Sequence, residues 1–163
     1  PVNLFVARFI GSPSMNLIFG NVVAEAGSLA VHIGSQSLDL NGLSPDRRSL
    51  LSAYGGRRIV LGVRPHALKD PAITPVKDAC RITGMVRLRE SLGTETVLHM
   101  VVDAERADVI RIVDSQEAAL ERETRIIACV DPASTVREQQ TVVLAVAPEK
   151  LHFFDAETER SIT

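Results

Sequence analysis

The chain has 163 residues, of which 45% are hydrophobic and 23% charged, and its formal net charge at pH 7 is -2. This apolar content is sufficient for one compact core or for two small subdomains. The near-neutral charge argues against a dedicated nucleic-acid-binding protein, because affinity for a phosphate backbone requires a marked surplus of basic residues.

The first eleven residues are typical of a short helix. Asn3 can cap its start, Gly11 can take a left-handed conformation after its end, and Pro13 prevents its continuation. A helix this short must bury an apolar face to be stable. The residues that we expect on that face are Phe5, Val6, Phe9 and Ile10.

From Met15 onward, short apolar runs separated by turn residues predict an all-β fold. The predicted strands span residues 17–24, 29–33, 58–63, 81–89, 95–102, 109–113, 124–130, 141–146 and 151–154. Residues 81–89 alternate between charged and apolar side chains, which predicts one wet face and one buried face. The string Ser91-Leu92-Gly93-Thr94 predicts a hairpin connection to the following strand.

Two stretches differ from this regular pattern. Pro45, Pro65, Pro71 and Pro75 cluster in the middle of the chain, where we expect only edge strands and loops because proline cannot donate to a central ladder. Further on, Asp114 precedes Glu117 at a spacing that starts helices, which predicts a short helix or helical turn over residues 115–123.

The sequence contains no recognisable catalytic motif. ATP hydrolysis requires a Gly-rich loop ending in Lys-Ser or Lys-Thr, and no lysine of the chain lies in such a loop. Residue counts leave a Ser-His-Asp arrangement open, but there is no Gly-x-Ser-x-Gly elbow. The four histidines are far apart in the sequence and lack the close spacing of common metal ligands. They are His32, His66, His99 and His152. We therefore expect no catalytic, cofactor-binding or metal-binding residue, and no enzyme activity in this chain.

Four strings, in order along nearly the whole chain, resemble one protein family. The string from Phe5 to Asn16 resembles the junction between the ATPase domain and a β-rich regulatory domain in the ATP-binding subunits of carbohydrate importers of the maltose and glycerol-3-phosphate type. The later matches are Leu61-Gly62-Val63-Arg64-Pro65, Glu90-Ser91-Leu92-Gly93-Thr94-Glu95 and His152-Phe153-Phe154-Asp155.

The resemblance implies a fold and a division of the chain. Residues 1–11 would be a linker helix that ends a missing ATPase domain. Residues 12–163 would form a regulatory, transport-associated (TOBE) domain with an OB-type β-barrel or sandwich. The resemblance leaves open whether this domain is one unit or two subdomains split near residues 70–80. ATP and Mg²⁺ would bind to the missing domain, and no cofactor would bind here. The implied partners are a second copy or paralogue of the ATP-binding subunit, the membrane permease subunits and a cytoplasmic regulator protein.

The same resemblance implies a regulatory surface. Its residues are Gly62, Arg64, Pro65, Glu90, Leu92, Gly93, Glu95, His152, Phe154 and Asp155. The residue pattern alone favours solvated charges for the two glutamates beside the turn, and a core anchor for Phe154. The chain departs from the family pattern at His66-Ala67, where Glu-His is usual, and at Gln139-Gln140, where Gly-Asp is common. A left-handed glutamine would cost about 1 kcal/mol.

The predicted function is regulation and dimerisation of an ABC sugar importer's ATP-binding subunit, in the cytoplasm and peripheral to the inner membrane. The distant Cys80 and Cys129 agree with this, since their spacing predicts two buried thiols in a reducing compartment. The alternative is an OB-type module that binds single-stranded nucleic acid or a small oxyanion. Strand binding requires aromatic platforms in a positive groove, and the six aromatic residues are not interleaved with the arginine pairs.

Overall fold

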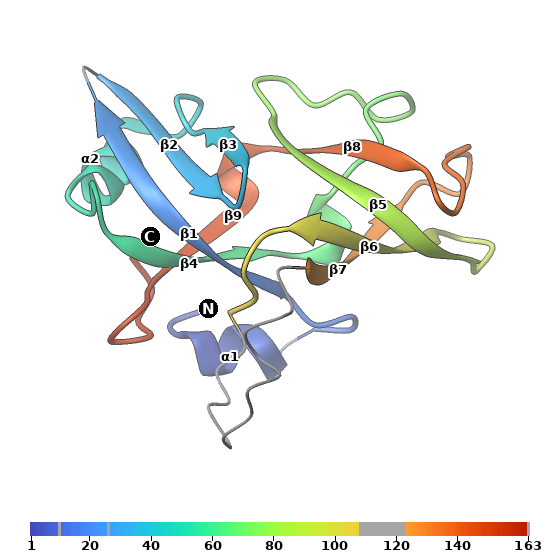
Figure 1. Ribbon diagram of the computed structural model, residues 1–163, viewed down its shortest axis with the longest axis horizontal. Helices are drawn as coiled ribbons and strands as arrows, with labels where there is room; N and C mark the ends of the chain where they lie inside the picture. The colour runs from blue at the N-terminus through green and yellow to red at the C-terminus, as the bar shows by residue number, and fades with distance from the viewer. Residues whose placement is uncertain (10, 26, 108–122, 163) are drawn as a thin grey trace.

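Two antiparallel sheets make up most of the structure (Figure 1). The computed structural model describes residues 1–9, 11–25, 27–107 and 123–162. Among these residues, a five-stranded sheet has the order β3-β2-β1-β4-β9 and a four-stranded sheet the order β7-β6-β5-β8. The first sheet comprises β1 (Asn16–Glu25), β2 (Ser28–Ile33), β3 (Gln36–Asp39), β4 (Arg58–Val63) and β9 (Leu151–Asp155). The second comprises β5 (Cys80–Ser91), β6 (Thr96–Asp103), β7 (Glu123–Val130) and β8 (Thr141–Val146). The all-β prediction is confirmed, in the form of two sheets that share a core.

The strand predictions are confirmed wherever the structure describes the residues. The predicted strand over 109–113 and most of the predicted helix over 115–123 lie outside the described residues, and residue 123 begins β7. The sequence analysis missed β3, which has only four residues and exposes most of them. Along β5, burial alternates as predicted as far as Val86, and a register irregularity between Val86 and Leu88 then interrupts the alternation.

The expectation of only edge strands and loops in the proline-rich middle is wrong for two segments. Strand β4 is central, because it pairs with both β1 and β9. Helix α2 spans Pro45–Ser52 and buries Leu51 completely. Pro45 stands in the first turn, where a missing amide hydrogen costs nothing because that amide has no partner within the helix. The short turns η1 (Pro65–Ala67) and η2 (Pro148–Lys150) also begin at a proline. Proline thus starts helical turns in this chain.

Helix α1 (Leu4–Phe9) begins and ends as predicted. The Asn3 side-chain Oδ1 accepts a hydrogen bond from the Val6 amide at 2.9 Å, which confirms the cap. Gly11 has a φ of +120°, which confirms the left-handed conformation after the helix. Among the described residues, no helix combines the length and the apolar character needed to cross a bilayer.

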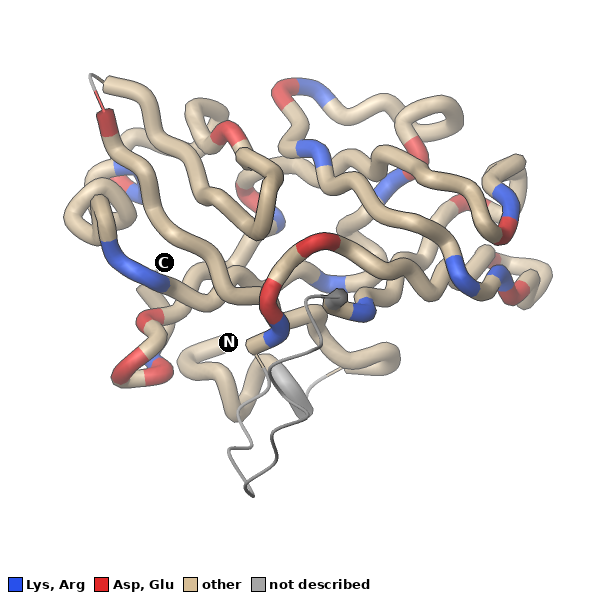
Figure 2. The backbone as a smooth tube through the Cα atoms, viewed as in Figure 1, with Lys and Arg blue, Asp and Glu red and all other residues tan. Residues whose placement is uncertain are grey.

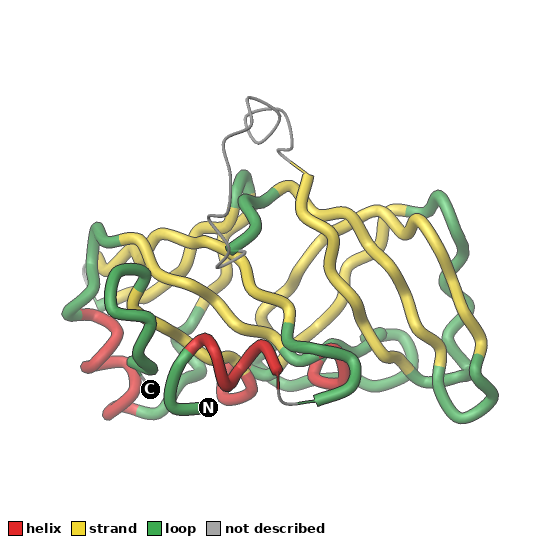
Figure 3. The backbone as a smooth tube through the Cα atoms, turned by 90° about the horizontal axis from the view of Figure 1, so that it is seen from below, coloured by secondary structure: helices red, strands yellow, loops and turns green. Residues whose placement is uncertain are grey.

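The predicted apolar face of α1 is wrong in part. Leu4 and Ala7 are the buried residues, and they pack against Val60 and Phe154 of the five-stranded sheet. Phe5 remains 67% exposed, and the side chains of Phe9 and Ile10 lie outside the described part. Figure 3 shows α1 beside the strands. The helix therefore buries its Leu4–Ala7 face within this chain and does not depend on another domain for it.

Two side-chain carboxamides join the sheets. Asn16 on β1 donates from Nδ2 to the Ile127 carbonyl at 2.8 Å and accepts from the Ile127 amide at 2.8 Å. Gln36 on β3 makes the same two-bond pair with Thr83 on β5, at 3.0 and 2.7 Å. Each carboxamide thus makes the two hydrogen bonds that a peptide group of a neighbouring strand would make. The main hydrophobic core is continuous across both sheets.

Two tight connections of the second sheet each contain a residue with positive φ. Gly93, in the loop between β5 and β6, has a φ of +84°. Gln139, before β8, has a φ of +60°, so the chain does hold a non-glycine residue in the left-handed region there.

We expect Asn16→Ala to lower the free energy of unfolding by about 1–3 kcal/mol, because the amide and carbonyl of the partly buried Ile127 would lose their hydrogen bonds to the Asn16 side chain. Urea denaturation measures the loss. The matched control is Asn21→Ala, an exposed position on the same strand, which should change stability by less than about 0.5 kcal/mol. Equal losses in the two variants would contradict a joining function for Asn16.

Gly34→Ala should be more damaging than Gly56→Ala. Both glycines have positive φ, +51° and +75°, so both substitutions carry the same left-handed strain. A Cβ on Gly34 would also lie 2.0 Å from the Asp103 carbonyl oxygen at the end of β6, whereas one on Gly56 would meet nothing within 4 Å. We expect an additional loss of about 1–3 kcal/mol for Gly34→Ala, measured by the same denaturation. A difference near zero would show that the β2–β3 turn is not packed against β6.

Candidate functional site

The residues of the predicted regulatory surface fall into separate places. Gly62 and His152 are direct partners on the neighbouring strands β4 and β9, and Phe154 pairs with Val60 two residues along. Arg64 and Pro65 connect β4 to η1. Four others, Glu90, Leu92, Gly93 and Glu95, lie at the turn between β5 and β6, and Asp155 is the last residue of β9. Two strings that are far apart in sequence thus meet in one sheet.

Close packing surrounds Gly62 in the β4–β9 pair. A Cβ at Gly62 would lie 2.6 Å from the Met15 sulfur and 3.0 Å from the Phe154 ring. Any larger residue would have to displace one of them. Phe154 is fully buried in the cluster that also holds Leu4 and Ala7, which confirms it as a core anchor. These residues hold α1 against the sheet.

His152 is a neutral, partly buried side chain. Burial, the largest cause, and the positive charges of the chain's amino group, Arg64 and Arg47 together lower its pKa to about 4. The imidazole therefore carries no charge at neutral pH, which argues for packing beside Gly62 and against an ionic contact with a partner.

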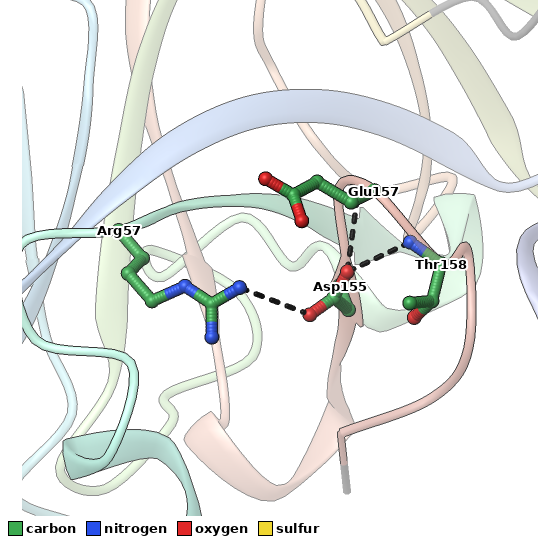
Figure 4. Close-up of polar contacts among 4 residues, drawn as sticks. All are labelled: Arg57, Asp155, Glu157 and Thr158. Carbon is green, nitrogen blue, oxygen red and sulfur yellow. Dashed lines mark hydrogen bonds and ion pairs between the residues drawn. The ribbon is translucent and has the colours of Figure 1, made fainter.

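Asp155 closes the turn after β9 (Figure 4). Its Oδ1 accepts hydrogen bonds from the amides of Glu157 at 2.9 Å and Thr158 at 2.8 Å, and Arg57 Nη2 lies 3.6 Å from Oδ2. The bond from Thr158 is the largest cause of a lowered pKa for this carboxyl. Because Asp155 is 7% exposed, we interpret it as a turn anchor.

The turn between β5 and β6 is the exposed part of the predicted surface. Leu92 is 60% exposed, and the space around Gly93 is open. At its base, Glu90 Oε2 lies 2.6 Å from His99 Nε2 across the two strands. Glu90 is exposed, as the residue pattern favoured, and it also has a histidine partner that the pattern did not indicate.

Glu95 also has a histidine partner. Its Oε2 lies 3.1 Å from His66 Nε2, and together with the Cys129 sulfur these atoms lie within 4.8 Å of one another. Burial, the largest cause, and the nearby Glu95 carboxylate together raise the pKa of Cys129 to about 11, and the charge of Lys69 opposes part of this rise. The spacing of residues in the sequence did not predict this group, because its members come from η1, the β5–β6 turn and β7. The one local sign in the sequence was the histidine at position 66, directly after Pro65.

We expect the stability of the protein to fall as pH decreases from about 6.5 to about 4, the window set by His152. The unfolded chain binds a proton on His152 through this range, whereas the folded chain does not, so acid favours unfolding. In His152→Gln the plot of unfolding free energy against pH should be flatter across the window. Asp155 affects the stability only at lower pH, because its pKa in the folded chain lies below the ordinary value of 3.8. Identical slopes in the two proteins would contradict this assignment.

Comparison with known proteins identifies relatives. Residues 11–68 match the family described as the MalK OB fold domain. The chain is 31% identical over 166 residues to the trehalose/maltose import ATP-binding protein MalK of Thermococcus litoralis, covering 99% of this chain and 38% of that protein.

Two further relatives are similarly named. The chain is 29% identical over 170 residues to the trehalose import ATP-binding protein SugC of Mycobacterium tuberculosis, covering 100% of this chain and 42% of that protein. It is 26% identical over 163 residues to the osmoprotective compounds uptake ATP-binding protein GgtA of Synechocystis, covering 99% of this chain and 38% of that protein. The chain thus spans about two fifths of the length of these relatives.

These matches bear on the earlier predictions. The OB fold match agrees with the predicted fold class, and it places this chain with a non-catalytic domain of such ATP-binding proteins. The chain is a mostly β protein with a MalK OB fold domain match, and its relatives are named as ATP-binding proteins of importers.

Proposed function

We propose that the chain is a regulatory and dimerisation domain of the ATP-binding subunit of an ABC sugar importer. The observation that carries the proposal is the OB fold match at residues 11–68 within a chain whose whole length aligns with import ATP-binding proteins. ATP and Mg²⁺ would bind to another part of that subunit. The domain would lie on the cytoplasmic side, with a second subunit, the permease subunits and a regulator protein as partners.

The β5–β6 turn is the part of the fold best suited to contact a partner. Leu88 and Leu92 are 45% and 60% exposed, and the Glu90–His99 pair lies between them. Exposed leucines offer apolar area to a partner, and a charged pair beside them favours one orientation of docking. We call residues 88–95 the hairpin tip.

A contact at the hairpin tip could regulate transport without touching ATP. A partner that binds one arrangement of two subunits better than another shifts the equilibrium between them by its difference in binding free energy. The surface needs only to be held rigidly on the domain, which the ladder of β5 with β6 and β8 provides.

The nucleic-acid alternative is less well supported. Phe153 and Phe154 are buried, Arg57 covers the Tyr54 ring, and Arg58 lies 3.7 Å from the centre of the Phe19 ring. These rings are not available as stacking platforms. Figure 2 shows acidic and basic segments interspersed over both sheets, which disfavours a single positive groove.

We expect the 163-residue chain to form a dimer that Leu92→Asp weakens, because a carboxylate would be buried at the contact. Light scattering gives the mass, and circular dichroism checks that the variant is folded. The matched control is Leu50→Asp, which alters a leucine that is 54% exposed on α2 and should leave the dimer intact.

Two outcomes would contradict this proposal. A wild-type chain that stays monomeric at high micromolar concentration has no dimerisation surface of its own. A dimer that survives Leu92→Asp but is lost in Phe5→Asp would place the contact at α1.

A further inference from the structure

Three side chains of metal-ligand type converge beneath η1. They are His66 from η1, Glu95 from the β5–β6 turn and Cys129 from β7, and one ligand atom of each lies within 4.8 Å of the others. The closest pair, His66 Nε2 and Glu95 Oε2, is 3.1 Å apart. Three different elements therefore place a nitrogen, an oxygen and a sulfur around one point.

Strand geometry explains why Cys129 points there. Ile126, Ala128 and Val130 belong to the main core, so Cys129 lies on the opposite face of β7. It is only 3% exposed, because η1 packs against this face. The thiol is thus buried beside His66 and away from the core.

The spacing suits a small tetrahedral cation. Ligands at 2.0–2.3 Å from zinc in a tetrahedron lie about 3.3–3.8 Å from one another. The His66–Glu95 distance is already close to this, and the 4.8 Å limit on the remaining distances requires only small side-chain movements.

We propose that His66, Glu95 and Cys129 form a binding site for a thiophilic divalent cation of the Zn²⁺ type. A thiolate and an imidazole favour Zn²⁺ over Mg²⁺ or Ca²⁺, which prefer oxygen ligands. On binding, Cys129 loses its proton to solvent and the thiolate sulfur bonds to the metal. The thiolate and the Glu95 carboxylate together neutralise the dication, and the fourth position is left for water.

Charged groups around the site act on cation binding in opposite directions. Lys69 lies near Cys129 and its charge opposes a cation, whereas Glu95 favours one. Since His66 is 56% exposed, the ion has a route from solvent. A bound ion would tie η1 to β7 and to the base of the hairpin tip.

The chain contains its own control for this site. Glu90 and His99 form a second exposed carboxylate–imidazole pair at 2.6 Å, and the only three-residue ligand group among the described residues is the one with Cys129. If a histidine and a carboxylate were sufficient, both pairs would bind the ion.

The test is titration of the reduced, chelator-treated 163-residue chain with Zn²⁺ by calorimetry and with Co²⁺ by absorption. We expect one ion per chain and a sulfur-to-cobalt charge-transfer band. His66→Ala should weaken Zn²⁺ binding by more than the roughly 10- to 100-fold typical of losing a residue outside the ligand set. Cys129→Ser should abolish the band, and His99→Ala should change neither measurement.

Three results would overturn the site. They are no saturable binding by the wild-type chain, binding and band unchanged in both His66→Ala and Cys129→Ser, or loss of binding in His99→Ala. His66 is exposed, so His66→Ala tests the site even if Cys129→Ser does not fold.

Discussion

The two sheets depend on a joint made by side-chain amides. Asn16 and Gln36 each present a donor and an acceptor in the geometry of a peptide group, and each completes a two-bond pair with a strand of the other sheet. Because buried backbone groups must be paired, these side chains allow two separate ladders to meet without leaving unsatisfied groups. The continuous core between the sheets then follows from this contact.

The joint also determines where the candidate sites can form. His66 follows β4 of the five-stranded sheet, whereas Glu95 and Cys129 belong to the four-stranded sheet. Their convergence therefore requires the sheets to be held in one relative position. Asn16 is bonded to Ile127, two residues before Cys129 on β7, so the joint and the three-residue group share a strand.

Local sequence patterns predicted the features that depend on neighbouring residues, such as strands and the helix cap. Alternation and turn residues predicted the strands, and Asn3 predicted the helix cap. Tertiary contacts decided the rest. Leu4 and Ala7, rather than the more hydrophobic Phe5, are the buried residues of α1 because of where the sheet lies. The sequence likewise did not predict the histidine partners of Glu90 and Glu95. Strand pairing brings His99 to Glu90, and the position of η1 brings His66 to Glu95.

The strings that carry the family resemblance divide into two kinds. Gly62, Phe154 and Asp155 are packing or turn residues whose surroundings leave little freedom, so a resemblance at these positions reports the fold. His66 is exposed, stands where the family pattern usually has a glutamate, and contacts Glu95. A departure at an exposed position that gains a specific partner cannot be explained by packing alone. Properties particular to this chain are therefore to be sought at His66 and the hairpin tip, and not in the strings that made its fold recognisable.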